Sequence, residues 1–110
     1  MYIRRFLEDD LRAGLRAREI LAVVGPRQCG KTTLLKHIFD GLNNAVFLDF
    51  EDRETLELFN EDIDSFAELY VKPYKYLFID EFQYAEDGGK TLKYLYDHHA
   101  TKIIISGSSA

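Results

Sequence analysis

GPRQCGKTT, residues 25–33, is the stretch of this sequence on which the prediction of the fold depends. The residues before it, 20–24 (ILAVV), are all apolar and predict a buried strand. The residues after it, 32–39, carry apolar side chains at helical spacing and predict a helix. A strand, a glycine-containing loop and a helix in this order favour a site where backbone N–H groups converge on an anion.

The stretch fits the pattern G-x-x-x-x-G-K-[ST], the Walker A motif, whose loop binds the phosphates of a nucleotide. Gly25 and Gly30 can adopt conformations that turn N–H groups inward, and the start of the helix adds unpaired N–H groups. We expect Lys31 to contact the β- and γ-phosphates and the Thr32 hydroxyl to bind Mg²⁺. The expected nucleotide-binding residues are Gly25, Pro26, Arg27, Gln28, Cys29, Gly30, Lys31, Thr32 and Thr33. The alternative, a chance glycine turn before a helix, is disfavoured because both flanking elements fit.

The composition is typical of a single folded domain. The chain has 110 residues, of which 46% are hydrophobic and 30% charged. No apolar run approaches the ~20 residues that span a bilayer, so we expect no membrane partner. The net charge of −5 provides no bulk positive field for nucleic acid. The one cysteine excludes an internal disulfide, and we expect a cytoplasmic location.

The rest of the chain predicts further alternation of helices and strands. The predicted elements are an amphipathic helix at 1–18, a strand at 45–50, one or two short helices at 51–68, a strand at 76–81, a loop at 83–89, a helix at 90–99 and a strand at 102–106. Gly14 weakens the prediction of the first helix. Within the acidic segment 51–68, Asp64 or Ser65 is the expected helix N-cap.

A second motif, YLFIDE at residues 76–81, has four apolar residues followed by two carboxylates. It predicts a buried strand with acid at its C-terminal tip, which is the form of a Walker B motif. We expect Asp80 to hold Mg²⁺, directly or through water, and Glu81 to orient or deprotonate the attacking water. An ordinary acidic strand end is the alternative, and the glycine loop in the same chain favours the functional interpretation.

The last predicted strand ends in the small polar run Ser106-Gly107-Ser108-Ser109. The Ser106 hydroxyl could reach the γ-phosphate or the attacking water. A plain serine–glycine turn is the alternative, and the sequence leaves open which serine of 106–109 would have this role. His98 and His99 point to different sides of a helix, so we interpret them as structural residues and not as a metal site.

Together these motifs resemble the AAA+-like P-loop ATPases of bacteria and archaea that carry a GPRQxGKTT loop. The matching pieces, in the family's order, are GPRQCGKTTLL at 25–35, FLDFED at 47–52, YLFIDEFQ at 76–83 and IIISGSSA at 103–110. The resemblance extends from about residue 20 to the end of the chain, and the combination of motifs is specific for the family.

The resemblance implies a three-layer α/β P-loop NTPase fold with a mostly parallel sheet in the order 1-4-3-2, and it implies ATP and Mg²⁺ as bound groups. The roles that it suggests are catalytic for Glu81, Lys31 and Ser106, and metal-binding for Thr32 and Asp80. Family members continue with a fifth strand and a separate C-terminal region. We therefore expect residues 1–110 to be a single, truncated domain that works with ATP and that region. Self-association remains open as another way to cover the strand at 20–24, and no arginine finger can be assigned.

Three functions compete at this point. The first is an ATPase that drives or switches an attached region, and the second is an ATP-binding switch with little hydrolysis. The third, a small-molecule kinase, is disfavoured because Glu81 directly follows Asp80 and no acceptor site or arginine-rich lid is recognisable. A GTPase is disfavoured because the chain has no Asn-Lys-x-Asp motif.

Overall fold

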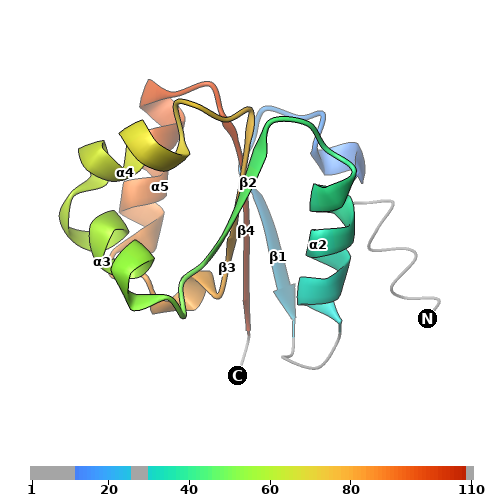
Figure 1. The fold of residues 1–110 in the computed structure, drawn as a ribbon, viewed down its shortest axis with the longest axis horizontal. Coiled ribbons are helices and arrows are strands. Elements are labelled where there is room, and N and C mark those ends of the chain that lie inside the picture. Colours follow the sequence, from blue (N-terminus) through green and yellow to red (C-terminus); the bar gives the residue numbers. More distant parts are fainter. Residues whose placement is uncertain (1–11, 26–29, 109–110) are drawn as a thin grey trace.

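The computed structural model of the protein describes residues 12–25 and 30–108. Its elements in chain order are β1 (Leu21–Gly25), α2 (Lys31–Asp40), β2 (Ala45–Asp49), α3 (Arg53–Glu61), α4 (Ile63–Tyr70), β3 (Tyr76–Asp80), the 3₁₀ helix η1 (Phe82–Tyr84), α5 (Gly88–His98) and β4 (Lys102–Ser108). The sheet is the middle of three layers, with α2 on one face and α3, α4 and α5 on the other (Figure 1). None of the described helices has the length and apolar character needed to cross a lipid bilayer.

All four strands of the described sheet are parallel, in the order β1-β4-β3-β2, which confirms the predicted order. In the register of the sheet, Val23 pairs with Ser106, and Asp49 pairs with Asp80. The carboxyl ends of the strands therefore meet at one edge, the lower edge in Figure 1. In open α/β sheets this is the edge where ligands bind.

Both faces of the sheet are buried by helices. Along β3, Leu77 and Ile79 pack against the layer of α3, α4 and α5, whereas Phe78 between them packs against α2. Because successive side chains of a strand point to opposite faces, a strand covered on both sides needs apolar residues at consecutive positions. This explains the continuous apolar run that predicted β3.

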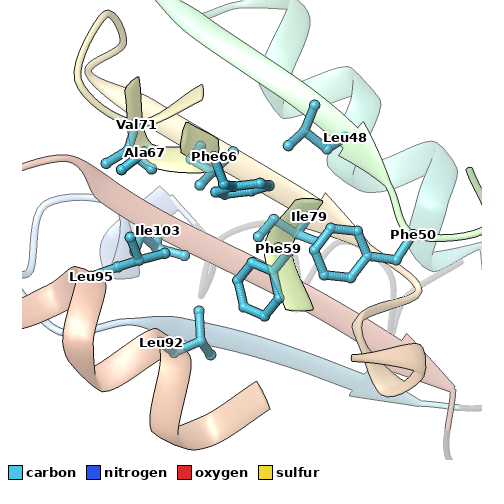
Figure 2. Packing of buried hydrophobic residues seen from close by; sticks show 11 residues of the cluster. Leu48, Phe50, Phe59, Phe66, Ala67, Val71, Ile79, Leu92, Leu95 and Ile103 are labelled. Atoms are coloured by element: carbon cyan, nitrogen blue, oxygen red, sulfur yellow. The ribbon is translucent and has the colours of Figure 1, made fainter. Parts of the chain in front are cut away.

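Three phenylalanines form the centre of the larger core (Figure 2). Phe50 follows β2, Phe59 comes from α3 and Phe66 from α4, and none is more than 1% exposed. The ring centroids of Phe50 and Phe59 are 5.1 Å apart, and those of Phe59 and Phe66 are 5.2 Å apart in an edge-on arrangement. The two acidic helices are thus fixed to the sheet by their aromatic faces, while their charges point to solvent.

The N-cap of α4 is Asp62, so the prediction of Asp64 or Ser65 is wrong. The Asp62 carboxylate accepts hydrogen bonds from the Ser65 backbone N–H at 3.2 Å and from its hydroxyl at 2.7 Å. Ser65 is therefore the donor to the cap, three residues into the helix, as in a capping interaction between N-cap and N3. These hydrogen bonds lower the pKa of the Asp62 carboxyl below its usual value of 3.8.

The loop predicted at 83–89 is shorter in the structure. The helix η1 forms at Phe82–Tyr84, and α5 begins at Gly88 instead of at residue 90. Asp87, before α5, has a left-handed backbone with φ 50° and makes no side-chain cap. As a consequence, Gln83 lies in a turn of helix directly after β3 and not in an extended loop.

β4 is longer than the predicted strand 102–106 and continues to Ser108. Its extension pairs with β1, since Val24 lies opposite Gly107 and Gly25 opposite Ser108. The end of β4 is therefore held against the residue at which the glycine-containing loop begins.

The prediction of a helix over residues 1–18 is wrong at its C-terminal end, and residues 1–11 lie outside the described part. The structure is helical at 12–14 and then turns, so the helix does not continue to residue 18. Instead, the Arg18 guanidinium lies 4.0 Å from the centroid of the Tyr96 ring and donates a hydrogen bond to the Tyr96 carbonyl oxygen at 2.9 Å. This contact with α5 competes with continuation of the helix.

Candidate functional site

Asp80 is the centre of a polar cluster at the carboxyl edge of the sheet. It is the last residue of β3 and is 3% exposed. One carboxylate oxygen, Oδ2, accepts a hydrogen bond from the Thr32 hydroxyl at 2.7 Å. The other oxygen, Oδ1, accepts from the Ser106 hydroxyl at 2.6 Å and from the Glu81 backbone N–H at 2.9 Å. Donors from α2, from β4 and from the turn after β3 thus fix the position of both oxygens, as a buried carboxylate requires.

The first turn of α2 brings a hydroxyl and the N-terminal backbone N–H groups of the helix to this cluster. Gly30, which precedes the helix, has φ 79° and ψ 18°, a conformation that favours glycine. Among the described residues, no side chain caps the N-terminus of α2, and the first turn of the helix holds no acidic residue. The positive end of the helix is therefore available to an anion, beside the Thr32 hydroxyl.

Lys31, the first residue of α2, has a buried side chain with 4% exposure. None of the salt bridges and hydrogen bonds seen among the described residues involves its ammonium group. Burial of a positive charge is costly unless an anion accompanies it. The chemistry of this position therefore fits a negatively charged ligand at the start of α2.

Glu81 follows Asp80 with a left-handed backbone, φ 54° and ψ 43°, so it ends β3 one residue earlier than predicted. This conformation is unusual for a residue with a side chain and costs about 1–3 kcal/mol. The Glu81 side chain is 7% exposed, and its Oε1 accepts a hydrogen bond from Gln83 Nε2 at 2.6 Å. The turn thus directs Glu81 away from the path of the strand and places it beside η1.

A cavity of about 400 Å³ opens beside Asp80, between α2 and the end of β2. The residues that line it are Thr32, Lys36, Phe39, Asp40, Phe47, Asp49 and Asp80. Lys36 and Asp40 were missed by the sequence analysis. The spacing of the sequence could have indicated them, because they follow Thr32 at intervals of four residues. Residues at this interval share one face of a helix.

The structure brings Lys31, Thr32, Asp80, Glu81 and Ser106 to one edge of the sheet. Pro26, Arg27, Gln28 and Cys29 lie outside the described residues. His98 and His99 lie far from this edge, because α5 ends at His98 and the chain then enters the opposite, amino end of β4. In the described part of the chain, no group of three or more His, Cys, Asp or Glu is arranged to hold a metal ion.

The Thr32 hydroxyl and the Asp80 carboxylate fit Mg²⁺ by the type of their oxygens and by their adjacency. Mg²⁺ is commonly held by one or two protein oxygens together with the phosphates of a substrate, so a larger set of acids is not needed. The buried Lys31 and the uncapped N-terminus of α2 fit the phosphates themselves.

A parallel sheet in the order 1-4-3-2, covered by helices on both faces, is the architecture of P-loop NTPase-like folds. Comparison with models of protein families matches residues 17–110 to the AAA domain family. The chain belongs to this family, as the resemblance of its motifs predicted, and the family is one of nucleotide-binding, ATPase-like domains. A comparison with curated proteins found no match.

Proposed function

We propose that this domain binds Mg-ATP at the carboxyl edge of its sheet and hydrolyses the bond between the β- and γ-phosphates. The observation that carries the proposal is the 2.7 Å hydrogen bond from the Thr32 hydroxyl to the Asp80 carboxylate. It joins two motifs that are 48 residues apart in the sequence. A hydroxyl at the start of a helix beside a buried carboxylate at a strand end is the pair of oxygens that P-loop proteins use for Mg²⁺.

In this proposal the loop from Gly25 to Thr33 binds the triphosphate. Lys31 contacts the β- and γ-phosphates, and its burial without an anionic partner among the described residues supports this role. Thr32 and Asp80 hold Mg²⁺, which neutralises charge on the phosphates when bound. The left-handed backbone of Gly30 supports the close approach of N–H groups to the phosphates.

Glu81 is the proposed general base. It accepts the proton of a water molecule whose oxygen forms a bond to the γ-phosphorus, while the bond from that phosphorus to the bridging oxygen of ADP breaks. Its position directly after the Asp80 carboxylate supports this role. Ser106 is the proposed sensor residue, and its hydrogen bond to Asp80 would link any change at the metal site to β4. The proposal includes an attached C-terminal region as the part that hydrolysis drives or switches, which the resemblance to the family implies.

An ATP-binding switch with little hydrolysis is the second candidate. It is favoured by one observation, namely that the Glu81 carboxylate is buried and already engaged by the Gln83 amide. A base that cannot reach water would leave binding intact and turnover low. The two candidates therefore differ in the expected rate of ATP hydrolysis and not in the expected affinity for ATP.

The test is to measure ATP affinity by calorimetry and phosphate release at saturating ATP, each with Mg²⁺ and with EDTA. We expect binding that depends on Mg²⁺, together with phosphate release that needs no second substrate. Binding without release would support the switch. No binding of ATP by the folded protein in the presence of Mg²⁺ would reject both candidates.

A further inference from the structure

We propose that Gln83 is a positioning residue that holds the Glu81 carboxylate and ties it to the end of β4. The inference rests on the proposed function, because it concerns the base of the same reaction. It goes beyond the Walker motifs, since it assigns a role to a residue of η1 and to two residues at the end of β4.

The Gln83 side-chain amide makes two hydrogen bonds to partners of opposite type. Its Nε2 donates to Glu81 Oε1 at 2.6 Å, and its Oε1 accepts from the Ser108 backbone N–H at 3.2 Å. A carboxylate can only accept and a backbone N–H can only donate. The two partners therefore determine one orientation of the amide, because a flipped amide would lose both bonds.

Gly107 provides the space that this amide occupies. A Cβ atom at residue 107 would lie 2.8 Å from Gln83 Oε1, closer than real Cβ contacts. Among the described glycines, only Gly30 has a positive φ, so the backbone of Gly107 does not itself require glycine. A larger residue at position 107 would therefore displace the end of the Gln83 side chain and not the backbone around it.

The Gln83 side chain adds a link between the Glu81 side chain and the end of β4, beside the pairing of β3 with β4 and the hydrogen bond from Ser106 to Asp80. Glu81 stands at the end of β3, while Ser108 stands at the end of β4 and pairs with Gly25, where the phosphate-binding loop begins. Gln83 therefore links the Glu81 carboxylate to the backbone of Ser108, which pairs with the first residue of that loop. A general base works only within hydrogen-bond reach of its proton, so restricting the rotation of Glu81 should affect the rate directly.

Gln83 is itself an exposed residue, and this separates a positioning role from a role in folding. Its replacement removes one part-buried and one exposed hydrogen bond and leaves no cavity in the core. We therefore expect its variants to unfold at nearly the temperature of the wild type. A loss of turnover without a loss of stability or ATP affinity is then specific to positioning.

The experiment compares turnover and ATP affinity for wild type, Gln83→Ala and Gln83→Glu. The glutamate variant keeps an oxygen for the Ser108 N–H but sets a second carboxylate against Glu81 in place of the donor, so it acts on the contact with the base both by loss of the hydrogen bond and by repulsion. We expect kcat to fall about tenfold in both variants, equivalent to about 1.4 kcal/mol, with the Kd for Mg-ATP changed less than about twofold. This magnitude is that of one charge-assisted hydrogen bond.

Gly107→Ala provides an independent route to the same effect, because the added methyl group displaces the Gln83 amide. It should lower kcat in the wild type and have no further effect in a Gln83→Ala background. The matched control is Gly89→Ala, since a Cβ at residue 89 meets no atom within 4 Å. This control should leave turnover unchanged.

Three results would overturn the inference while leaving the proposed function intact: an unchanged kcat in both Gln83 variants, a raised kcat, or additive effects of Gly107→Ala and Gln83→Ala. A raised kcat would mean that Gln83 restrains the base and does not position it. Wild-type protein that neither binds nor hydrolyses ATP would instead reject the proposed function, and the inference with it.

Discussion

The Thr32 hydroxyl donates a hydrogen bond of 2.7 Å to Oδ2 of Asp80, and this contact fixes the start of α2 against the end of β3. The remaining oxygen of Asp80 is held by Ser106 and by the Glu81 backbone. Both oxygens of one buried carboxylate are therefore shared between three elements. These hydrogen bonds connect α2, β3 and β4 at the carboxyl edge of the sheet.

Lys31→Ala should abolish tight binding of ATP. Loss of the contact between the buried ammonium group and the phosphates should weaken the binding free energy by about 2–5 kcal/mol. Calorimetric titration with Mg-ATP measures this directly. Lys90→Ala, which removes an exposed lysine of α5, is the control and should bind as wild type does. Equal affinity in the Lys31 variant would contradict the phosphate-binding role of the loop.

Glu81→Gln should keep ATP affinity and lower the rate of phosphate release about 10²–10⁴-fold. Glutamine preserves the size of the side chain but cannot accept a proton from water. Single-turnover and steady-state phosphate release, each at saturating Mg-ATP, provide the measurement. If the variant turns over as fast as wild type, another group is the base.

Asp80→Asn should raise the Mg²⁺ concentration needed for ATP binding, because the neutral amide is a weaker ligand for a hard cation. Titration of Mg²⁺ at fixed ATP gives the midpoint for each protein. Asp97→Asn removes an exposed carboxylate that pairs with Lys93 and serves as the control. Identical midpoints for the Asp80 variant and wild type would exclude Asp80 as the metal-binding acid.

Phe59→Ala should destabilise the fold by about 3–5 kcal/mol, because it empties the centre of the aromatic core. Leu69→Ala, on the exposed side of α4, should stay within about 0.5 kcal/mol of wild type. Urea denaturation followed by circular dichroism compares the free energies of unfolding. A small effect of Phe59→Ala would mean that the core does not depend on this ring.

Asp62→Asn should be less stable than wild type at neutral pH, and the difference should shrink in acid. The pKa of the Asp62 carboxyl is lowered in the folded protein, so its ionised form stabilises the fold above the unfolded value of 3.8. This contribution is lost as the pH falls through the lower folded pKa. Thermal unfolding of both proteins from neutral pH down to about pH 2 tests the convergence. A difference that is constant with pH would contradict the capping role of the charge.

Much of the fold and of the proposed site could be predicted from local pattern. The apolar run of β3 predicted a strand covered on both faces, and Leu77, Phe78 and Ile79 are all buried. The motifs around Lys31 and Asp80 predicted that two distant segments would meet, because parallel strands present their carboxyl ends at one edge. Such features depend on spacing along the chain and on general rules of sheet topology.

Predictions from local sequence pattern were wrong where several neighbouring residues suit the same structural position. Asp62, Asp64 and Ser65 are all suitable N-caps by type, and only the end of α3 at Glu61 selects Asp62. The helix expected to reach residue 18 ends at residue 14, and Arg18 instead contacts Tyr96, which is distant in the sequence. In both cases a neighbouring element decided between options that the sequence left nearly equal.

The sequence by itself determined the class of the fold, the strand order expected from the family's motifs, and the types of residue at the carboxyl edge. Only the tertiary structure decided which of those residues contact one another. It directed the hydroxyl of Ser106 to Asp80, turned Glu81 out of β3, and brought Gln83 to Ser108 across 25 residues. The physical reason is that periodicity records which side of an element is buried, whereas a hydrogen bond depends on how separate elements are packed together.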